Sequence, residues 1–259
     1  MHSLGLLYTV SGFCVGALVG MTGVGGGSLM TPLLILLFGI HPASAVGTDL
    51  LYAAGTKTGG AVVHRINRSV DWRLVRHLAS GSVPAAAATL LILSQFDLRG
   101  RPMQHFFSVA LGAALVVTAL AVIFRPWLIA WFTGRVGEPR PRTAATLTVA
   151  TGAALGVLVS LTSVGAGALG VTILVLLYPR LPTPCIVGSD IAHAVPLTLV
   201  AGLGHLLLST INFQVLGLLL LGSLPGVFLG SQLAVRVPDA VLRLALSGVL
   251  IIVGGRLML

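Results

Sequence analysis

The chain has 259 residues, of which 56% are hydrophobic and 8% are charged, and it carries a formal net charge of +9. A soluble domain has roughly a quarter charged residues and about 45–50% apolar ones, so this composition argues against a soluble enzyme or a disordered scaffold. The basic residues lie in short gaps between apolar runs, a pattern typical of membrane-protein loops rather than of a nucleic-acid-binding face. We therefore expect an integral membrane protein in contact with the lipid bilayer, with no nucleic-acid partner.

Apolar segments follow one another along the whole chain. They are residues 4–38, 43–63, 74–93, 106–124, 144–178, 186–208, 215–233 and 241–259. The first and fifth would form helices of roughly 52 Å, well beyond a hydrocarbon core of about 30 Å. Each contains a glycine cluster where it can break, at residues 23–27 and 165–167. We predict an all-α, multi-pass protein in which each long segment is a helix, a Gly-rich turn and a short second helix.

An internal repeat divides the chain into two halves. Residues 16–29 align with residues 156–169 with eight identities in fourteen positions. After one inserted residue, Asp49 aligns with Asp190 and His64 with His205. These polar matches are not explained by apolar composition. The repeat predicts two transmembrane units, residues 1–124 and 144–259, each with one Gly-broken segment and three further spans. A polar linker, residues 125–143, joins them.

The distribution of arginine indicates how the halves are oriented. The loop after the second apolar segment is rich in arginine (residues 65, 68, 73 and 76), whereas its counterpart, residues 208–212, has no charge. If each broken segment returns to its own side, the halves are inverted and the loop arginines divide eleven to three. If each segment crosses, the halves are parallel and the division is nine to five. The positive-inside bias favours inverted repeats with a cytoplasmic linker, while crossing and re-entrant segments both remain open.

The two Gly-rich turns are the predicted substrate site. Inverted repeats with discontinuous helices are typical of secondary transporters, which bind substrate near the midplane. Glycine allows close approach of the backbone to a ligand, and the N-terminus of a short helix attracts anions. We predict that these turns bind a small anionic substrate, although small residues also serve simple helix packing. The candidate residues are Thr22, Gly23, Gly25, Gly26, Gly27, Ser28, Thr162, Ser163, Gly165 and Gly167.

Three charged residues lie in the apolar spans away from the span ends. Asp49 and Asp190 are the carboxylates there, and each could relay protons or cap a helix. His193 follows Asp190 by three residues and could pair with it on one helix face. Lys57, the sole lysine, is a candidate for holding the anion, with snorkelling to the surface as the alternative. The sequence contains no metal-ligand spacing and no nucleophile–base pattern, so we expect neither a metal, nor a cofactor, nor an enzyme.

Residues 20–32 (GMTGVGGGSLMTP) and 45–49 (AVGTD) resemble the signature of the TauE/SafE family. Residues 163–167 (SVGAG) and 187–190 (VGSD) are similar to its second copy. The resemblance implies a multi-pass transporter of the bacterial inner membrane that exports sulfite, sulfoacetate or another organosulfonate. It also implies proton coupling and alternating access. A passive channel for similar anions is the alternative, and the oligomeric state, including a homodimer, is left open.

Overall fold

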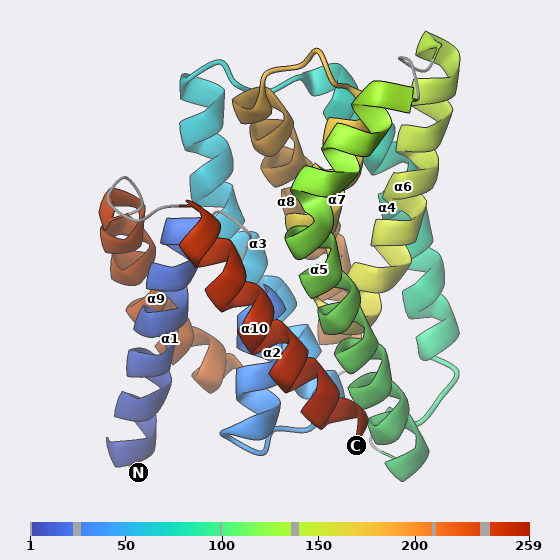
Figure 1. Ribbon diagram of the computed structural model, residues 1–259. Helices are drawn as coiled ribbons and strands as arrows, with labels where there is room; N and C mark the ends of the chain where they lie inside the picture. Colours follow the sequence, from blue (N-terminus) through green and yellow to red (C-terminus); the bar gives the residue numbers. More distant parts are fainter. Residues whose placement is uncertain (1, 23–26, 99, 136–139, 209–210, 234–238) are drawn as a thin grey trace.

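The computed structural model describes residues 2–22, 27–98, 100–135, 140–208, 211–233 and 239–259, and these residues form ten α-helices in one bundle (Figure 1). The helices are α1 (His2–Thr22), α2 (Gly27–Leu36), α3 (Pro42–Ile66), α4 (Trp72–Leu93), α5 (Arg101–Arg135), α6 (Pro141–Thr162), α7 (Ala168–Leu177), α8 (Thr183–Leu207), α9 (Phe213–Leu233) and α10 (Asp239–Met258). The predicted all-α fold is confirmed.

Both long apolar segments are interrupted at their glycine clusters, as predicted. The first breaks between α1 and α2, where Gly23, Gly25 and Gly26 lie outside the described residues. The second breaks between α6 and α7, where Ser163, Gly165 and Gly167 have φ values of 59°, 118° and 124°. A right-handed helix cannot continue through positive φ, which glycine adopts readily. The break therefore follows from local backbone chemistry.

The two interrupted pairs approach the middle of the bundle from opposite ends. Figure 1 shows that α2 runs back toward the end of the bundle where α1 begins, and that α7 runs back toward the end where α6 begins. This arrangement matches the re-entrant reading of the broken segments. The inverted orientation of the halves across a bilayer stays a prediction.

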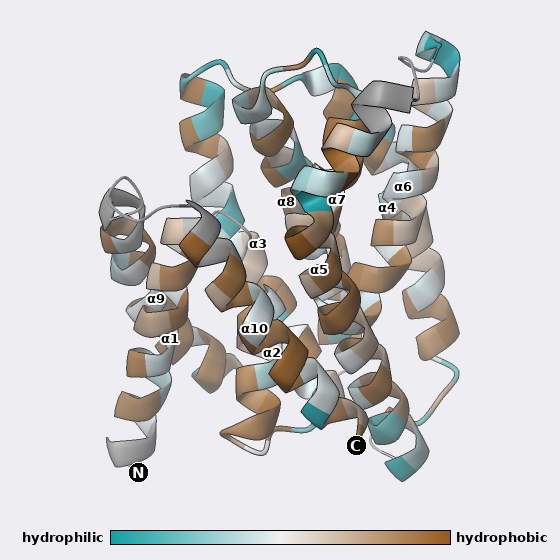
Figure 2. Cartoon of the chain, in the orientation of Figure 1, coloured by the Kyte–Doolittle hydropathy of each residue, from teal (hydrophilic) through white to brown (hydrophobic). Residues whose placement is uncertain are grey.

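The outer surface of the bundle is apolar. Helical segments long and apolar enough to cross a membrane are Arg101–Trp131, Pro141–Thr162, Thr183–Leu207 and Phe213–Gly230, and shorter apolar ones are Gly5–Met21, Ala168–Leu177 and Leu244–Met258. Most residues along the helices are apolar (Figure 2), and large side chains such as Leu91, Leu207 and Ile252 are exposed. Apolar patches of this extent mark a surface that faces lipid, so the protein is a multi-pass membrane protein.

The helix α5 is longer than the apolar segment from which it was predicted. It continues through Pro126 to Arg135, so the first part of the predicted linker, residues 125–143, is helical. The rings of Trp127 and Trp131 stack there with centroids 6.4 Å apart. Residues 127–132 are largely apolar again after Pro126, and this explains the extension of the helix. The division into residues 1–124 and 144–259 remains a prediction.

The two halves interlock through equivalent helix pairs. The helix α1 packs on α9, α6 packs on α4, and α3 packs on α8. Gly16 lies against the backbone of Ser223, and Gly156 lies against the backbone of Ser82. Gly16 is the repeat partner of Gly156, and Ser82 is the repeat partner of Ser223. Each half thus makes the same contact with the other.

Hydrogen bonds between the halves also join equivalent positions of the repeat. The Asp71 N–H donates to the hydroxyl of Ser189 at 2.8 Å, and the Asn212 N–H donates to the hydroxyl of Thr48 at 3.2 Å. Thr48 and Ser189 occupy equivalent positions in the repeat, as do Asp71 and Asn212. Each half of the repeat found in the sequence therefore makes, with equivalent residues, the same contact to the other half.

Glycine packing between α4 and α6 yields a stability prediction. A Cβ at Gly152 would collide with the backbone oxygen of Leu78, whereas a Cβ at Gly248 would meet nothing within 4 Å. We expect Gly152→Ala to lower the free energy of unfolding by about 1–3 kcal/mol, because a backbone atom cannot move aside without separating the helices. Gly248→Ala should be neutral or stabilising by up to about 1 kcal/mol. Denaturant unfolding of both variants in detergent measures the difference, and equal stabilities would refute this packing.

Candidate functional site

The packing of α3 against α8 brings three charged side chains together at the centre of the bundle. Asp49 and Asp190 are both fully buried at 0% exposure, and Lys57 is half-buried. Lys57 is within electrostatic reach of both carboxylates. We call Asp49, Lys57 and Asp190 the charge cluster. Burial of three charges in an apolar bundle is costly unless they are paired or serve a function.

Asp49 connects the first half to the second break. Its carboxylate accepts a hydrogen bond from the hydroxyl of Thr31 on α2. The side chain of Ser163, in the second break, approaches the same carboxylate. The other oxygen, Oδ1, has no hydrogen-bond partner in the described part of the chain, and the buried Ser163 hydroxyl also has none. The Ser163 hydroxyl therefore faces the Asp49 carboxylate across the second break.

Asp190 lies against the N-terminal end of α7. A Cβ at Gly170, in the first turn of α7, would collide with its Oδ1, and the backbone of Gly167 faces the same carboxylate. Neither of its oxygens has a hydrogen-bond partner among the described residues. The ammonium of Lys57 and, after it, the backbone at the positive end of the α7 dipole compensate its charge.

The structure shows which helix ends the two aspartates face. The helices that carry them begin at Pro42 and Thr183, so neither Asp49 nor Asp190 caps its own helix. Each instead faces a short helix, Asp49 through Thr31 of α2 and Asp190 through the first turn of α7. About two turns of helix precede each aspartate.

Lys57 points inward to the second break. Its Nζ donates a hydrogen bond to the carbonyl oxygen of Ala166 at 3.1 Å. Ala166 belongs to the Gly-rich turn between α6 and α7, so the cation of the first half contacts the backbone of the second half. The snorkelling alternative places the ammonium at the end of α3, and this inward contact favours the anion-holding role.

The remaining predicted site residues lie at or beside the ends of the interrupted helices. Thr22 ends α1 and Gly27 begins α2, while Ser28 is buried at 5% exposure. The hydroxyl of Thr162 donates to the Leu158 carbonyl at 2.7 Å and accepts from the Val164 N–H at 3.1 Å. Its hydrogen is thus engaged within the turn. Thr162 therefore shapes the break, and its hydroxyl hydrogen is not free to bind the anion.

His193 has a different partner from the one predicted. Its Nε2 lies 2.8 Å from the hydroxyl of Ser82 on α4, and no hydrogen bond joins it to Asp190 in the part of the chain described. Ser82 and Thr31 were both missed as site residues. A signal for Ser82 was present, because the Gly-Ser-x-Pro pattern at residues 81–84 recurs at residues 222–225. The sequence contains no comparable signal for Thr31.

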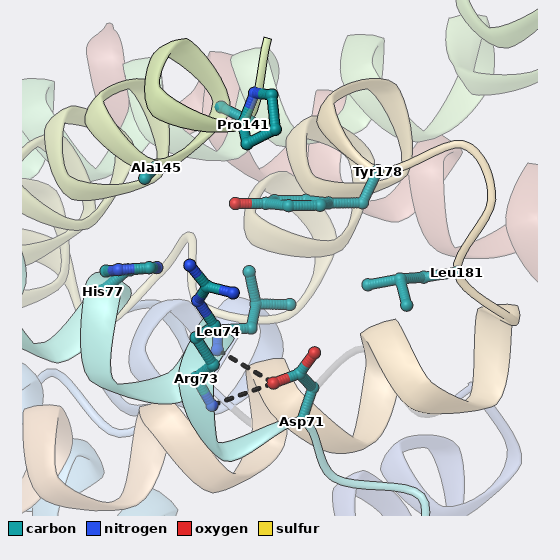
Figure 3. A pocket seen from close by; sticks show the side chains of 9 residues that line it. Asp71, Arg73, Leu74, His77, Pro141, Ala145, Tyr178 and Leu181 are labelled. Atoms are coloured by element: carbon teal, nitrogen blue, oxygen red, sulfur yellow. Dashed lines mark hydrogen bonds between the residues drawn. The ribbon is translucent and has the colours of Figure 1, made fainter. Parts of the chain in front are cut away.

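A separate cavity of about 200 Å³ lies at one end of the bundle (Figure 3). It is formed by the starts of α4 and α6 and the end of α7, and is lined by Asp71, Arg73, Leu74, His77, Pro141, Ala144, Ala145, Tyr178 and Leu181. The Asp71 Oδ1 accepts from the N–H groups of Arg73 and Leu74 at 2.8 and 3.2 Å. Figure 3 shows the Arg73 guanidinium near His77 and Tyr178, and the described residues give it no ion-pair partner. This end of the bundle can attract anions, though no residue of the cavity belongs to the charge cluster.

Interrupted helices beside buried charges in a multi-pass helical bundle are typical of membrane transporters. The family model described as sulfite exporter TauE/SafE matches residues 8–257. The chain therefore belongs to the TauE/SafE family and is a membrane transporter.

Curated relatives agree with this assignment. The chain is 37% identical over 247 residues to the "Probable membrane transporter protein YjnA" of Bacillus subtilis, covering 95% of this chain and 96% of that protein. It is 25% identical over 240 residues to the "Probable membrane transporter protein YdhB" of the same organism, covering 90% and 92% of the two chains. No solved structure matches the chain.

Proposed function

We propose that this protein is a secondary transporter of the bacterial inner membrane that exports a small sulfur-containing anion in a proton-coupled cycle. Sulfite, sulfoacetate and other organosulfonates are the substrate class. One observation carries the proposal. The only lysine of the chain donates to the backbone of a Gly-rich helix break, beside two buried carboxylates with unpartnered oxygens. The family description, sulfite exporter, supports the choice of anion.

An oxyanion at the second break would find several donors. A lysine ammonium has three N–H donors, and one of those on Lys57 goes to Ala166. The hydroxyl of Ser163 is buried beside the Asp49 carboxylate and meets no hydrogen-bond criterion among the described residues. At the start of α7, the N–H groups of Gly170 and Val171 donate to carbonyls of the turn, whereas those of Ala168 and Leu169 are at the open end of a helix. Several donors around one helix break suit an anion with three or more oxygens.

Alternating access requires elements that can move relative to the charge cluster, and the two short helices are suited to this role. Each ends in a contact with its long partner. The rings of Tyr8 and Phe38 stack at 4.2 Å near the end of α2, and the Tyr178 and Thr148 hydroxyls lie 2.8 Å apart at the end of α7. The two contacts lie at equivalent positions of the two repeats, about 140 residues apart along the chain. Release of one contact and closure of the other would expose the site to opposite ends in turn.

The proposal is tested with purified protein in proteoliposomes loaded with radiolabelled sulfite. We expect saturable efflux that an imposed pH gradient changes at clamped membrane potential, together with competition by sulfoacetate but not by chloride. Flux that does not saturate and ignores the pH gradient would contradict a coupled transporter and identify an anion channel. Absence of flux with sulfite, sulfoacetate, thiosulfate and toluenesulfonate would refute the substrate class.

A further inference from the structure

We infer that the anion enters the charge cluster together with a proton, that Asp190 takes this proton, and that the anion and the proton cross the membrane in the same direction. This inference rests on the anion site proposed above and adds the sign of the coupling and the residue that carries it. With this sign, the outward gradient of the anion drives export, and an inward proton gradient opposes it.

The charges of the cluster provide the first argument. With all three groups ionised, Asp49, Lys57 and Asp190 carry a net charge of −1. A bound anion adds at least one further negative charge, and the sulfoacetate dianion adds two, inside an apolar bundle where like charges repel strongly and water cannot screen them. A proton on one carboxylate offsets one of these charges. Binding of the anion and binding of the proton therefore favour each other.

The hydrogen bonds distinguish the two carboxylates. Asp49 accepts a hydrogen bond from Thr31, which stabilises its ionised form. Both oxygens of Asp190 lack a partner among the described residues. An ionised carboxylate can only accept hydrogen bonds and repels an oxyanion, whereas a protonated one can donate to it. Protonation of Asp190 thus converts an unfavourable neighbour of the anion into a ligand.

Asp190 and the anion also compete for the same positive groups. In the empty site, the first turn of α7 and the ammonium of Lys57 lie close to Asp190. These are the groups that an anion at the second break would contact. When the anion occupies them, the carboxylate loses its compensation and takes up a proton. When the anion leaves, Asp190 regains that compensation and releases the proton on the same side.

Other titratable groups around α8 have different surroundings. The helices packed against α8 are α3, α4, α6 and α7. On α3, Nδ1 of His64 contacts Ser69, and on α8 the Nε2 atoms of His193 and His205 contact Ser82 and the Ser160 carbonyl. The helix α4 carries Arg73, Arg76 and His77 near its start, α6 carries Arg142 in its first turn, and α7 has no titratable residue. His193 is the competitor for the proton, because its Nδ1 has no partner among the described residues.

Isothermal titration of the purified full chain with sulfoacetate at pH 8, in two buffers of different ionisation enthalpy, counts the protons taken up on binding. We expect at least one proton for each bound anion in the wild type and in His193→Asn. Asp190→Asn should bind sulfoacetate with proton uptake reduced to near zero. Binding without proton uptake in the wild type, or loss of uptake in His193→Asn with retention in Asp190→Asn, would overturn the inference. Absence of binding in the wild type would instead count against the proposed function.

A second measurement does not depend on the folding of a variant. Wild-type proteoliposomes that hold a pH-sensitive dye are given an inward gradient of sulfoacetate. Entry of the anion should acidify the lumen, because each anion brings a proton with it. Influx of sulfoacetate with an alkaline or unchanged lumen would refute movement in the same direction.

Discussion

Replacement of Lys57 by Met is expected to lower the initial rate of sulfite transport by about 100-fold or more. Truncation of one partner of a buried charge pair between a protein and its ligand costs about 2–5 kcal/mol, and the middle of this range corresponds to roughly a hundredfold or greater change in binding. Lys57 has no substitute, because it is the sole lysine of the chain and donates directly to the second break. Radiolabelled sulfite flux in proteoliposomes, at equal amounts of folded protein, measures the effect.

Two further variants separate transport from folding. Lys57→Met leaves two buried carboxylates without their cation and is expected to unfold at a lower temperature. The double variant Lys57→Met/Asp190→Asn removes one of these charges, so it should regain thermal stability without regaining transport. Arg65→Gln, at an exposed position on the same helix, is the matched control and should transport normally. A wild-type rate in Lys57→Met would exclude Lys57 from the anion site.

Gly167→Ala is expected to reduce transport at least about tenfold and to destabilise the protein by about 1–3 kcal/mol. Gly167 precedes α7 with φ 124° and ψ −82°, a conformation that a residue with a Cβ rarely adopts. The Ala variant must therefore change the shape of the turn that presents the Ala166 carbonyl to Lys57. Flux and thermal unfolding measured on the same preparation test both parts of the prediction.

Gly217→Ala is the control for this experiment. Gly217 lies inside α9, and a Cβ there would meet nothing within 4 Å. It should leave both flux and stability near the wild-type values. If Gly167→Ala behaved like Gly217→Ala, the backbone geometry of the second break would have no part in transport.

The fold could be predicted from the sequence because it depends on the length of the apolar segments, on composition and on the internal repeat. An apolar segment of about 35 residues is too long for one span, and a glycine cluster marks where it breaks. The short helices accordingly begin at Gly27 and Ala168. The site could be predicted from the sequence only in part. The sequence indicated Lys57, Asp49 and Asp190, since charges within apolar spans are few and expensive, but it missed Thr31 and assigned His193 the wrong partner.

The sequence alone determined that this protein is a helical membrane protein with two repeats and two broken helices, because a bilayer imposes strict limits on segment length and polarity. Only the tertiary structure decided which groups meet. Lys57 reaches Ala166, 109 positions away, and Asp190 lies against α7. Helices that are apolar on all sides show no periodic contrast between an inner and an outer face. Their partners are chosen by the fit of small residues such as Gly16 and Gly156, a property of shape that composition and spacing do not contain.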